Sequence, residues 1–231
     1  MEIIPAIIPK SFSELKEKMS SVRDLVPLVQ VDVMDGKLTP EASWPYLSAG
    51  QDQDFANIIS EKSGFPFWQE LDFEVDLMVR HPENVWRDWL RAGASRIIIH
   101  IESTFVLESI IKEFKTEFFG KDSFIYSQIG LAINIETPVQ KILPFVQDID
   151  FVQCMGIAKI GFQGQPFDER VLLKIRELKS VYPDLIISVD GGVSLETVSR
   201  LIKAGVSRLV AGSAIFASGD IIQTIKQFNS I

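Results

Sequence analysis

Two short segments place carboxylates at the end of an apolar run, directly before glycine. Residues 31–36 read Val-Asp-Val-Met-Asp-Gly, and residues 185–192 read Leu-Ile-Ile-Ser-Val-Asp-Gly-Gly. Each pattern predicts a buried strand with a glycine turn after it, which brings Asp32 (with Asp35) or Asp190 to the carboxyl end of the strand. Two facing strand-end aspartates suit a reaction in which a proton leaves one side of a carbon and returns to the other.

A lone aspartate at the end of a strand is more often a turn former or a helix cap than a catalyst. Asp32 and Asp190 depart from that common case because they occupy the same place in two similar segments that lie far apart in the chain. The two carboxylates can meet only if the fold brings their strands together, and we expect these strands to be direct neighbours in one sheet.

Eight short runs rich in Ile, Val and Leu predict strands, and stretches with helix signals separate most of them. The runs are nearly continuous, as expected of strands buried on both faces of a parallel sheet. They are Ile3–Ile8, Leu28–Met34, Phe73–Val79, Arg96–Ile101, Gln128–Asn134, Phe151–Met155, Leu185–Val189 and Arg208–Ala211.

Helix start and stop signals lie between these runs. Ser11 is a typical cap, Thr137-Pro138 places proline in a first helical turn, and Gly205 is a typical helix end. The eightfold alternation predicts an α/β fold, a (β/α)8 TIM barrel that forms a single domain over residues 1–231. A doubly wound open sheet is the second interpretation.

The composition is that of an ordinary globular protein, with 46% hydrophobic and 23% charged residues. No apolar run approaches the roughly 20 residues that span a bilayer. The net charge of −8 disfavours nucleic acid or an anionic membrane as a partner. Cys154 is the single cysteine, which excludes an internal disulfide and is compatible with the cytoplasm, where we expect the protein.

In a barrel of this kind, the carboxyl ends of the strands and the loops after them form the active face. This rule gathers the following side chains on one rim: Asp32, Asp35, Asp76, His100, Asn134, Met155 and Asp190. His100 is a candidate site residue or, equally, a buried core histidine. Met34 and Met155 fit the core, although thioethers at a rim also pack against a sugar face.

Glycine clusters in the last third of the chain predict a phosphate site. They follow the sixth, seventh and eighth predicted strands, at Gly161 and Gly164, at Gly191-Gly192 and at Gly212-Ser213. Glycines there let backbone N–H groups approach an anion, and barrels commonly bind phosphate after strands seven and eight. Three clusters on consecutive loops therefore predict a small phosphorylated ligand.

The stretch from Lys37 to Phe67 predicts a long loop with at most one short helix. A loop of this length in a compact domain is usually functional or covers a site. Its aromatic residues form an interface or a lid or, as we favour, pack the loop onto the barrel; they are Trp44, Tyr46, Phe65, Phe67 and the adjoining Trp68.

These segments resemble the ribulose-phosphate 3-epimerase family of ribulose-phosphate-binding barrels along nearly the whole chain. The resemblance rests on residues 5–8, 31–36, 77–82, 92–102, 161–167, 189–192 and 211–216. It implies a (β/α)8 barrel that binds a phosphopentulose, with a divalent metal, held by two histidines and two aspartates, that polarises the ketose. It also implies that two aspartates exchange the C3 proton through an enediolate and so interconvert ribulose 5-phosphate and xylulose 5-phosphate.

The resemblance carries over to the active site only in part. Asp32 and Asp190 match the two acid–base aspartates, which are also metal ligands in the family. Gln30 and Asp76 stand where the family has its metal-binding histidines, and Ala6 replaces a serine near the substrate. The glycines of the phosphate site match best. The family's common behaviour also predicts a homo-oligomer.

The changed ligands change the expected metal. Imidazole suits zinc and iron, whereas carboxylate and carbonyl oxygens suit magnesium, calcium or manganese. Gln30, Asp32, Asp76 and Asp190 therefore predict an all-oxygen site for Mg²⁺ or Mn²⁺ rather than Zn²⁺ or Fe²⁺, bound weakly and through waters. The other interpretation is that no metal binds. The three carboxylates then repel one another, and at least one pKa rises unless a cation such as Lys159 compensates.

Three functions remain open on the sequence. The first is a ketose-phosphate 3-epimerase in which Asp32 and Asp190 transfer the proton. The second keeps the barrel and the phosphate site but performs aldolase- or decarboxylase-like chemistry with a lysine, for which Lys159 is the candidate. The third is a non-catalytic phosphosugar-binding protein. We favour the first because both aspartates are retained, although a fold alone does not fix a function.

Overall fold

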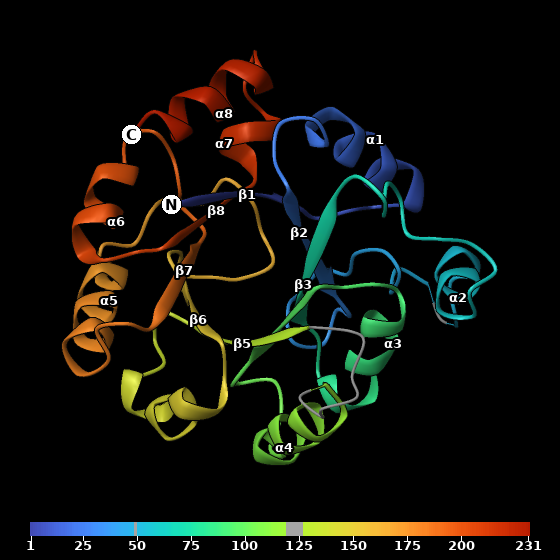
Figure 1. Cartoon of the computed structure of the whole chain (residues 1–231), viewed down its shortest axis with the longest axis horizontal. Coiled ribbons are helices and arrows are strands. Elements are labelled where there is room, and N and C mark those ends of the chain that lie inside the picture. Colours follow the sequence, from blue (N-terminus) through green and yellow to red (C-terminus); the bar gives the residue numbers. More distant parts are fainter. Residues whose placement is uncertain (49, 119–126) are drawn as a thin grey trace.

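The computed structural model describes residues 1–48, 50–118 and 127–231. Eight parallel strands close into a barrel in the order of the chain, and helices surround it (Figure 1). The fold is therefore the predicted (β/α)8 TIM barrel and not an open sheet. The strands are β1 (Glu2–Ile7), β2 (Leu28–Met34), β3 (Asp72–Met78), β4 (Arg96–His100), β5 (Gln128–Ile133), β6 (Phe151–Met155), β7 (Ile186–Asp190) and β8 (Arg208–Ala211).

The strands form where the apolar runs predict them, because both of their faces are covered. β2 is buried along its whole length, since one face of a barrel strand packs on helices and the other lines the interior. β1 pairs with β8 from Glu2 opposite Arg208 to Pro5 opposite Ala211. This pairing of the first strand with the last closes the barrel.

Helices lie between most strands. The first begins at its predicted cap, where the Ser11 side chain accepts a hydrogen bond from the Glu14 backbone N–H. The helical elements are α1 (Phe12–Val22), α2 (Gln53–Ile59), η1 (Pro82–Asn84), α3 (Trp86–Arg91), α4 (Leu107–Phe118), η2 (Val139–Lys141), η3 (Leu143–Asp148), α5 (Arg170–Val181), α6 (Val198–Ala204), α7 (Ser213–Phe216) and α8 (Ile221–Asn229), where η marks a 3-10 helix.

The helix predicted to begin at Thr137-Pro138 is not an α-helix. Two 3-10 helices, η2 and η3, follow β5 instead. Pro144 lies near the start of η3. Its ring and its missing N–H exclude the α-helical hydrogen bond to Gln140, so the chain takes the tighter and shorter form.

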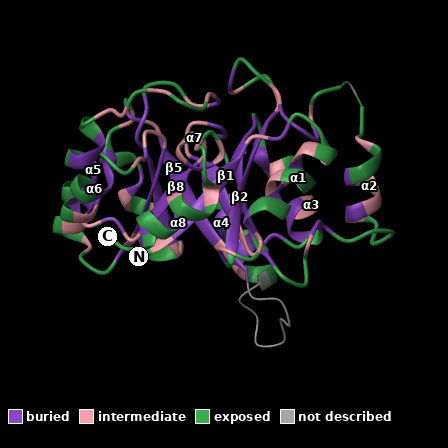
Figure 2. Cartoon of the chain, turned by 90° about the horizontal axis from the view of Figure 1, so that it is seen from above, coloured by how far each residue is buried: buried purple, intermediate pink, exposed green. Residues whose placement is uncertain are grey.

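Most of the apolar core lies between the barrel and its helices. Figure 2 shows buried strands enclosed by helices whose outer faces are exposed. On the inner side of the strands, the described residues form two small apolar clusters, one of Ile4, Ala6, Leu28 and Val210 and one of Ile98, Ala132 and Phe151. The remaining inward positions are mostly polar, which leaves room for a site at one end and an ion-pair network at the other.

The segment between β2 and β3 packs onto the barrel through its aromatic side chains, as we favoured. Trp44 and Phe65 are buried, and their ring centroids lie 6.1 and 6.5 Å from that of Trp89 on α3. The Trp89 indole N–H donates to the Tyr46 hydroxyl at 3.1 Å. Trp68 is exposed. This packing fixes the loop that follows Asp32.

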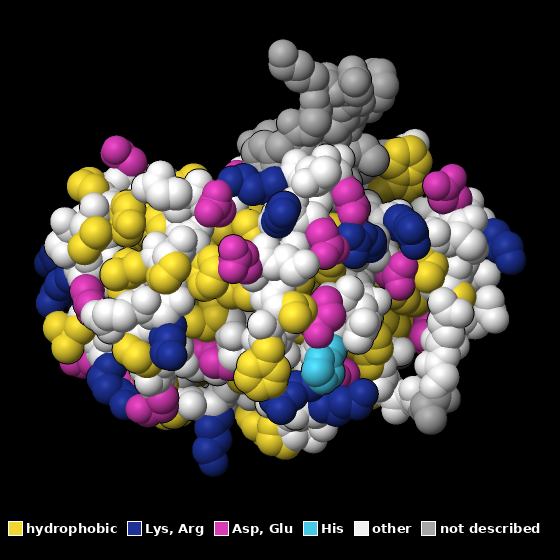
Figure 3. All heavy atoms as spheres, turned by 90° about the horizontal axis from the view of Figure 1, so that it is seen from below, with side chains coloured by type: hydrophobic (Ala, Val, Ile, Leu, Met, Phe, Trp, Pro, Cys, Tyr) yellow, Lys and Arg dark blue, Asp and Glu magenta, His cyan; other side chains and the backbone are white. Residues whose placement is uncertain are grey.

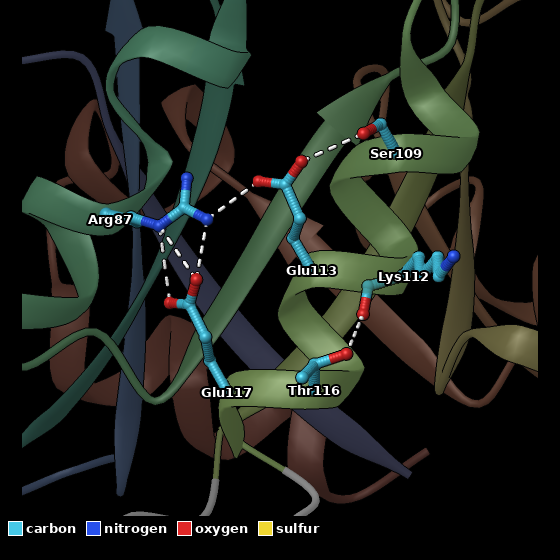
Figure 4. Close-up of polar contacts among 6 residues, drawn as sticks. All are labelled: Arg87, Ser109, Lys112, Glu113, Thr116 and Glu117. Carbon is cyan, nitrogen blue, oxygen red and sulfur yellow. Dashed lines mark hydrogen bonds and ion pairs between the residues drawn. The ribbon is translucent and has the colours of Figure 1, made fainter.

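The outer surface carries charges of both signs. On the face in Figure 3, lysine and arginine side chains are interspersed with aspartate and glutamate. Between α3 and α4, Arg87 donates to Glu113 at 2.7 Å and to Glu117 at 2.6 Å (Figure 4). Exposed ion pairs of this kind contribute little to stability. None of the described helices is long and apolar enough to cross a membrane.

A partly buried charge network lies at the amino-terminal end of the barrel. Glu74 of β3 is fully buried and accepts from Arg96 of β4 at 3.1 Å. Arg96 also lies 3.3 Å from Glu2, and Arg208 of β8 lies 3.2 Å from the same carboxylate. The Arg208 guanidinium lies over the Phe151 ring, 4.5 Å from its centroid. The network joins five strands at the end opposite the aspartates.

Replacement of Glu74 by alanine should destabilise the barrel. The substitution leaves the Arg96 charge half-buried with only one remaining carboxylate, and breaking a buried pair in this way costs about 3 kcal/mol. The free energy of unfolding in urea measures the loss. Glu113→Ala, which removes an exposed partner of Arg87, is the control and should change the midpoint little. Equal losses in the two variants would show that the buried network does not stabilise the barrel.

Candidate active site

Three aspartates meet at the carboxyl end of the barrel. Asp32 on β2 is paired in register with Asp76 on β3, and Asp190 is the last residue of β7. One carboxylate oxygen of each lies within 4.8 Å of the others. The expectation that the strands of Asp32 and Asp190 are direct neighbours was wrong. β2 and β7 are separated in the strand order, and the closed barrel brings their ends together across its interior.

Two glutamine side chains hold these carboxylates. Gln30 Nε2 donates to Asp32 Oδ1 at 2.7 Å and to Asp190 Oδ2 at 2.9 Å. Gln153 Nε2, on β6, donates to Asp76 Oδ2 at 3.2 Å and to Asp190 Oδ2 at 3.5 Å. Both glutamines are fully buried. Their N–H groups therefore bridge the three aspartates and offset part of the repulsion between them.

His100 joins the cluster from the end of β4. Its side chain is fully buried, and Nε2 lies 3.0 Å from Asp76 Oδ1. The other ring nitrogen, Nδ1, lies 3.9 Å from Glu102. Glu102 in turn accepts from the Asn134 backbone N–H at 2.9 Å and from the Thr137 hydroxyl. His100 is therefore both a buried residue and a direct partner of the aspartate cluster, whereas Asn134 takes part through its backbone.

Burial and mutual repulsion raise the pKa of two of the aspartates. Burial, together with the charges of Asp190 and Asp76, raises the pKa of Asp32 well above its usual range. Burial and the charge of Asp76 raise the pKa of Asp190 to about 7. Burial would lower the pKa of His100, but the neighbouring Asp76 carboxylate outweighs it and raises that pKa overall. The aspartate cluster therefore holds protons at a higher pH than isolated carboxyl groups do.

A cavity of about 380 Å³ extends from Asp32 and Asp190 toward the loops after β6, β7 and β8. Its volume suits a ligand the size of a sugar phosphate. The glycines from which the sequence predicts a phosphate site line this cavity together with one serine, namely Gly161, Gly164, Gly191, Gly192, Gly212 and Ser213.

The turn after β7 can only be built from glycine. Gly191 and Gly192 have φ values of 93° and 68°. A Cβ on Gly191 would lie 2.7 Å from Ile157, and one on Gly192 would lie 2.7 Å from the Phe167 backbone. Conformation and space therefore both exclude a side chain. The backbone itself forms this wall of the cavity, as a phosphate-binding corner requires.

The remaining candidate residues lie in different surroundings. Met155 lines the cavity, whereas Met34 is fully buried, with its sulfur next to the backbone of Gly161. Lys159 is exposed and is not among the residues that line the cavity. Its position offers no compensation for the charges of the aspartates, which is consistent with the raised pKa values of two of them.

Asp35 is a turn former and not a fourth member of the aspartate cluster. Its carboxylate accepts from the backbone N–H groups of Lys37 at 3.0 Å and of Arg80 at 3.1 Å. It thereby joins the loop after β2 to the loop after β3. This is the common role of a strand-end aspartate.

Two glutamines of the site were not predicted. Gln153 interrupts an apolar run two residues before Met155. Because alternate residues of a strand share a face, its position predicts that Gln153 lies on the same side of the strand as Met155. Gln163 lies in the loop after β6, where it lines the cavity and donates to the Ala6 backbone oxygen at 3.1 Å. A loop glutamine has no periodic pattern that indicates which way it points.

The sequence matches a known family over most of its length. A sequence model of the Ribulose-phosphate 3 epimerase family matches residues 2–216. The chain belongs to this family. It is 29% identical to the ribulose-phosphate 3-epimerase of Bacillus subtilis, over 98% of this chain and 97% of that protein. It is 31% identical to the ribulose-phosphate 3-epimerase of Schizosaccharomyces pombe, over 93% of this chain and 86% of that protein.

Solved structures with the same fold include more distant proteins. A 3-hexulose-6-phosphate synthase is 18% identical, with a TM-score of 0.67 over 100% of this chain and 99% of that one. KGPDC from Streptococcus mutans, solved in complex with D-R5P, is 14% identical, with a TM-score of 0.68 over 99% of this chain and 95% of that one. At these identities the likeness shows the shared barrel and nothing finer.

The donor atoms of this family member fit a hard divalent cation. Asp32, Asp76 and Asp190 offer carboxylate oxygens within 4.8 Å of one another, which is the donor chemistry that Mg²⁺ or Mn²⁺ prefers. Gln30 directs its nitrogen at two of these carboxylates, while its Oε1 is buried without a hydrogen-bond partner in the described part of the chain. Half a turn of the amide would present that oxygen as a fourth ligand.

Asp190→Asn should stabilise the protein at high pH but hardly at low pH. With a pKa of about 7, the folded carboxyl keeps a proton that the unfolded chain loses near pH 4. Raising the pH through this window therefore destabilises the wild type, by at most about 4 kcal/mol above pH 8. Asparagine carries no charge, so the variant should have a higher Tm at about pH 8.5 and a similar Tm at about pH 4, where the carboxyl of the wild type is still substantially protonated in both states.

Thermal unfolding with a chelator present measures this difference. A Tm difference that is the same at both pH values would contradict the raised pKa of Asp190.

Proposed function

We propose that this protein is a ketose-phosphate 3-epimerase that interconverts D-ribulose 5-phosphate and D-xylulose 5-phosphate. The proposal rests on one observation: two buried carboxylates, Asp32 and Asp190, stand at one end of a cavity whose other wall is lined with glycines. A phosphate on the backbone N–H groups of Gly191, Gly192 and Gly212 would bring C3, two carbons from the phosphate-bearing carbon, to these carboxylates.

The reaction moves one proton at C3. The ionised aspartate accepts that proton, and the electron pair of the C3–H bond passes into an enediolate whose charge rests on the C2 oxygen. The protonated aspartate then donates its own proton to the opposite face of C3, and the C2 carbonyl forms again. The raised pKa values of Asp32 and Asp190 support this division into one acid and one base near neutral pH.

The amides and the imidazole position the carboxylates for this transfer. Without a bound cation, Gln30 bridges Asp32 and Asp190 with hydrogen bonds of 2.7 and 2.9 Å and so restricts the rotation of both. The imidazole of His100 lies beside Asp76, with Nε2 3.0 Å from the carboxylate. A carboxylate held in this way loses little freedom when the substrate binds, which favours transfer at a fixed carbon.

We further propose that Asp32, Asp76, Asp190 and Gln30 hold a divalent cation, Mg²⁺ or Mn²⁺ in preference to Zn²⁺ or Fe²⁺. When bound, such a cation polarises the ketose carbonyl and makes the C3 proton more acidic. The preference for a hard cation is supported by the set of oxygen donors and by the absence of imidazole at the two positions where the family has histidine.

The two other functions have less support. Aldolase- or decarboxylase-like chemistry needs a lysine at the site, and Lys159 is exposed and outside the residues that line the cavity. A protein that only binds a phosphosugar does not require two buried carboxyls with raised pKa values at the end of its cavity.

Proton exchange at C3 tests the proposed reaction. Incubation with D-ribulose 5-phosphate in D2O, followed by NMR, should place deuterium at C3 and yield D-xylulose 5-phosphate. Asp32→Asn and Asp190→Asn should each slow the exchange by about 10²–10⁴-fold, because each removes one partner of the proton transfer. Asp35→Asn is the matched control and should keep most of the rate, since Asp35 serves a turn. Binding of the sugar phosphate without exchange under any metal would rule out the epimerase.

Metal binding is tested without reference to turnover. Mn²⁺ should bind at one site per chain with a characteristic electron paramagnetic resonance signal, and Mg²⁺ should displace it. Gln30→Leu should weaken Mn²⁺ binding at least about tenfold, because it removes an oxygen ligand. Calorimetry that finds tight, stoichiometric Zn²⁺ binding instead would contradict the preference for a hard cation.

The assembly and the location of the protein stay predictions. We propose a homo-oligomer in the cytoplasm, as the resemblance to the family and the single cysteine predict. Light scattering on the purified protein measures the number of chains in the assembly.

A further inference from the structure

The segment between β6 and α5, residues 156–169, lines the cavity and is anchored at two points. The backbone of Gly161 packs closely on Thr39, since a Cβ there would lie 2.8 Å from the Thr39 side chain. Phe167 packs on the glycine turn after β7. Between these two anchors, the side chain of Gln163 reaches β1 and lines the cavity.

Contact with Ala6 fixes the orientation of the Gln163 amide. Nε2 donates to the Ala6 backbone oxygen at 3.1 Å, and an acceptor of this kind admits only the nitrogen end of an amide. A Cβ on Gly212 would overlap the same nitrogen, so the glycine leaves the space that the amide occupies. The amide has a second N–H and a carbonyl oxygen to offer to a ligand in the cavity.

Strand register places this amide between the two ends of the cavity. Ala6 lies opposite Gln30 of β2, two residues before Asp32. On its other side, β1 pairs with β8, which leads directly to Gly212. Gln163, bound to Ala6, therefore lies between the carboxylates and the phosphate corner.

We propose that Gln163 recognises the C4 hydroxyl of the ketopentose phosphate and so determines which configuration at C4 the enzyme accepts. This inference rests on the proposed function. With C3 at the aspartates and the C5 phosphate at the glycines, C4 is the carbon that lies between them. One amide can donate to and accept from a single hydroxyl, and a group placed to do so rejects a substrate whose hydroxyl points elsewhere.

Because the reaction changes the configuration at C3, the enzyme can distinguish its substrates from other ketopentose phosphates by their configuration at C4. An epimerase at C3 must bind both configurations at C3, because each is the product of the other. Stereochemical discrimination must therefore come from a centre that the reaction leaves unchanged, and in a ketopentose phosphate C4 is the only one. A side chain beside C4 can discriminate in both directions of the reaction without favouring substrate over product.

The test compares the wild type with Gln163→Met, which keeps the length of the side chain and removes the amide. Deuterium exchange at C3 gives kcat/KM for D-ribulose 5-phosphate and for its C4 epimer, and calorimetry gives the Kd of each. We expect Gln163→Met to lower kcat/KM about tenfold for D-ribulose 5-phosphate and less than about twofold for the C4 epimer. The Kd of inorganic phosphate should change less than about twofold, because backbone N–H groups bind it.

Gln165→Met is the matched control. Gln165 belongs to the same segment and also lines the cavity, but its amide donates to the Lys159 backbone oxygen at 2.6 Å and is held within the segment. Its loss should loosen the segment and leave the preference at C4 unchanged.

Three results would overturn the proposal: a wild type without preference at C4, an unchanged preference in Gln163→Met, or an equal loss of preference in both variants. If the wild type binds both sugar phosphates but exchanges no deuterium, the proposed function fails. The ratio of the two Kd values, in the wild type and in Gln163→Met, then decides the role of Gln163 by itself.

Discussion

Repulsion between three buried carboxylates is the constraint on which the rest of this site depends. Two unit charges 4.8 Å apart repel by about 3–4 kcal/mol at an effective dielectric constant of about 20. Three such pairs approach the total stability of a typical domain. Part of this repulsion is relieved when Asp32 or Asp190 is protonated. The N–H groups of two glutamines and the imidazole of His100 relieve a further part, and a cation would relieve more. The proton that one of these aspartates keeps is the proton that the proposed epimerisation donates to C3.

The barrel remains stable despite the repulsion between the three carboxylates, because other parts of the structure stabilise it. Apolar burial between the strands and the surrounding helices provides most of the favourable free energy, while among the described residues the interior holds two small apolar clusters. The interior is polar at both ends, with carboxylates at one and the Glu74–Arg96 pair at the other. Inward positions are therefore free to serve chemistry, provided that each charge has a partner.

Much of this organisation could be predicted from residue types alone. Alternating strand and helix patterns predicted the barrel, and the rule that strand ends form the active face gathered Asp32, Asp76, Asp190 and His100. The contacts between them could not be predicted, because a closed barrel brings together strands that are not neighbours. Gln163 was missed for a related reason: its contact depends on the path of a loop, which no periodic pattern reports.

The pairing of β1 with β8 also has a consequence for the folding of the chain during its synthesis. Ala6 stands on one side of this seam and Gly212 on the other, so the cavity straddles the first and last strands of the barrel. A ribosome releases them some two hundred residues apart. Until Arg208–Ala211 has emerged, the edges of β1 and β7 have no partner and are open to association with other chains. The last strand therefore completes the ligand pocket and removes that hazard in a single step.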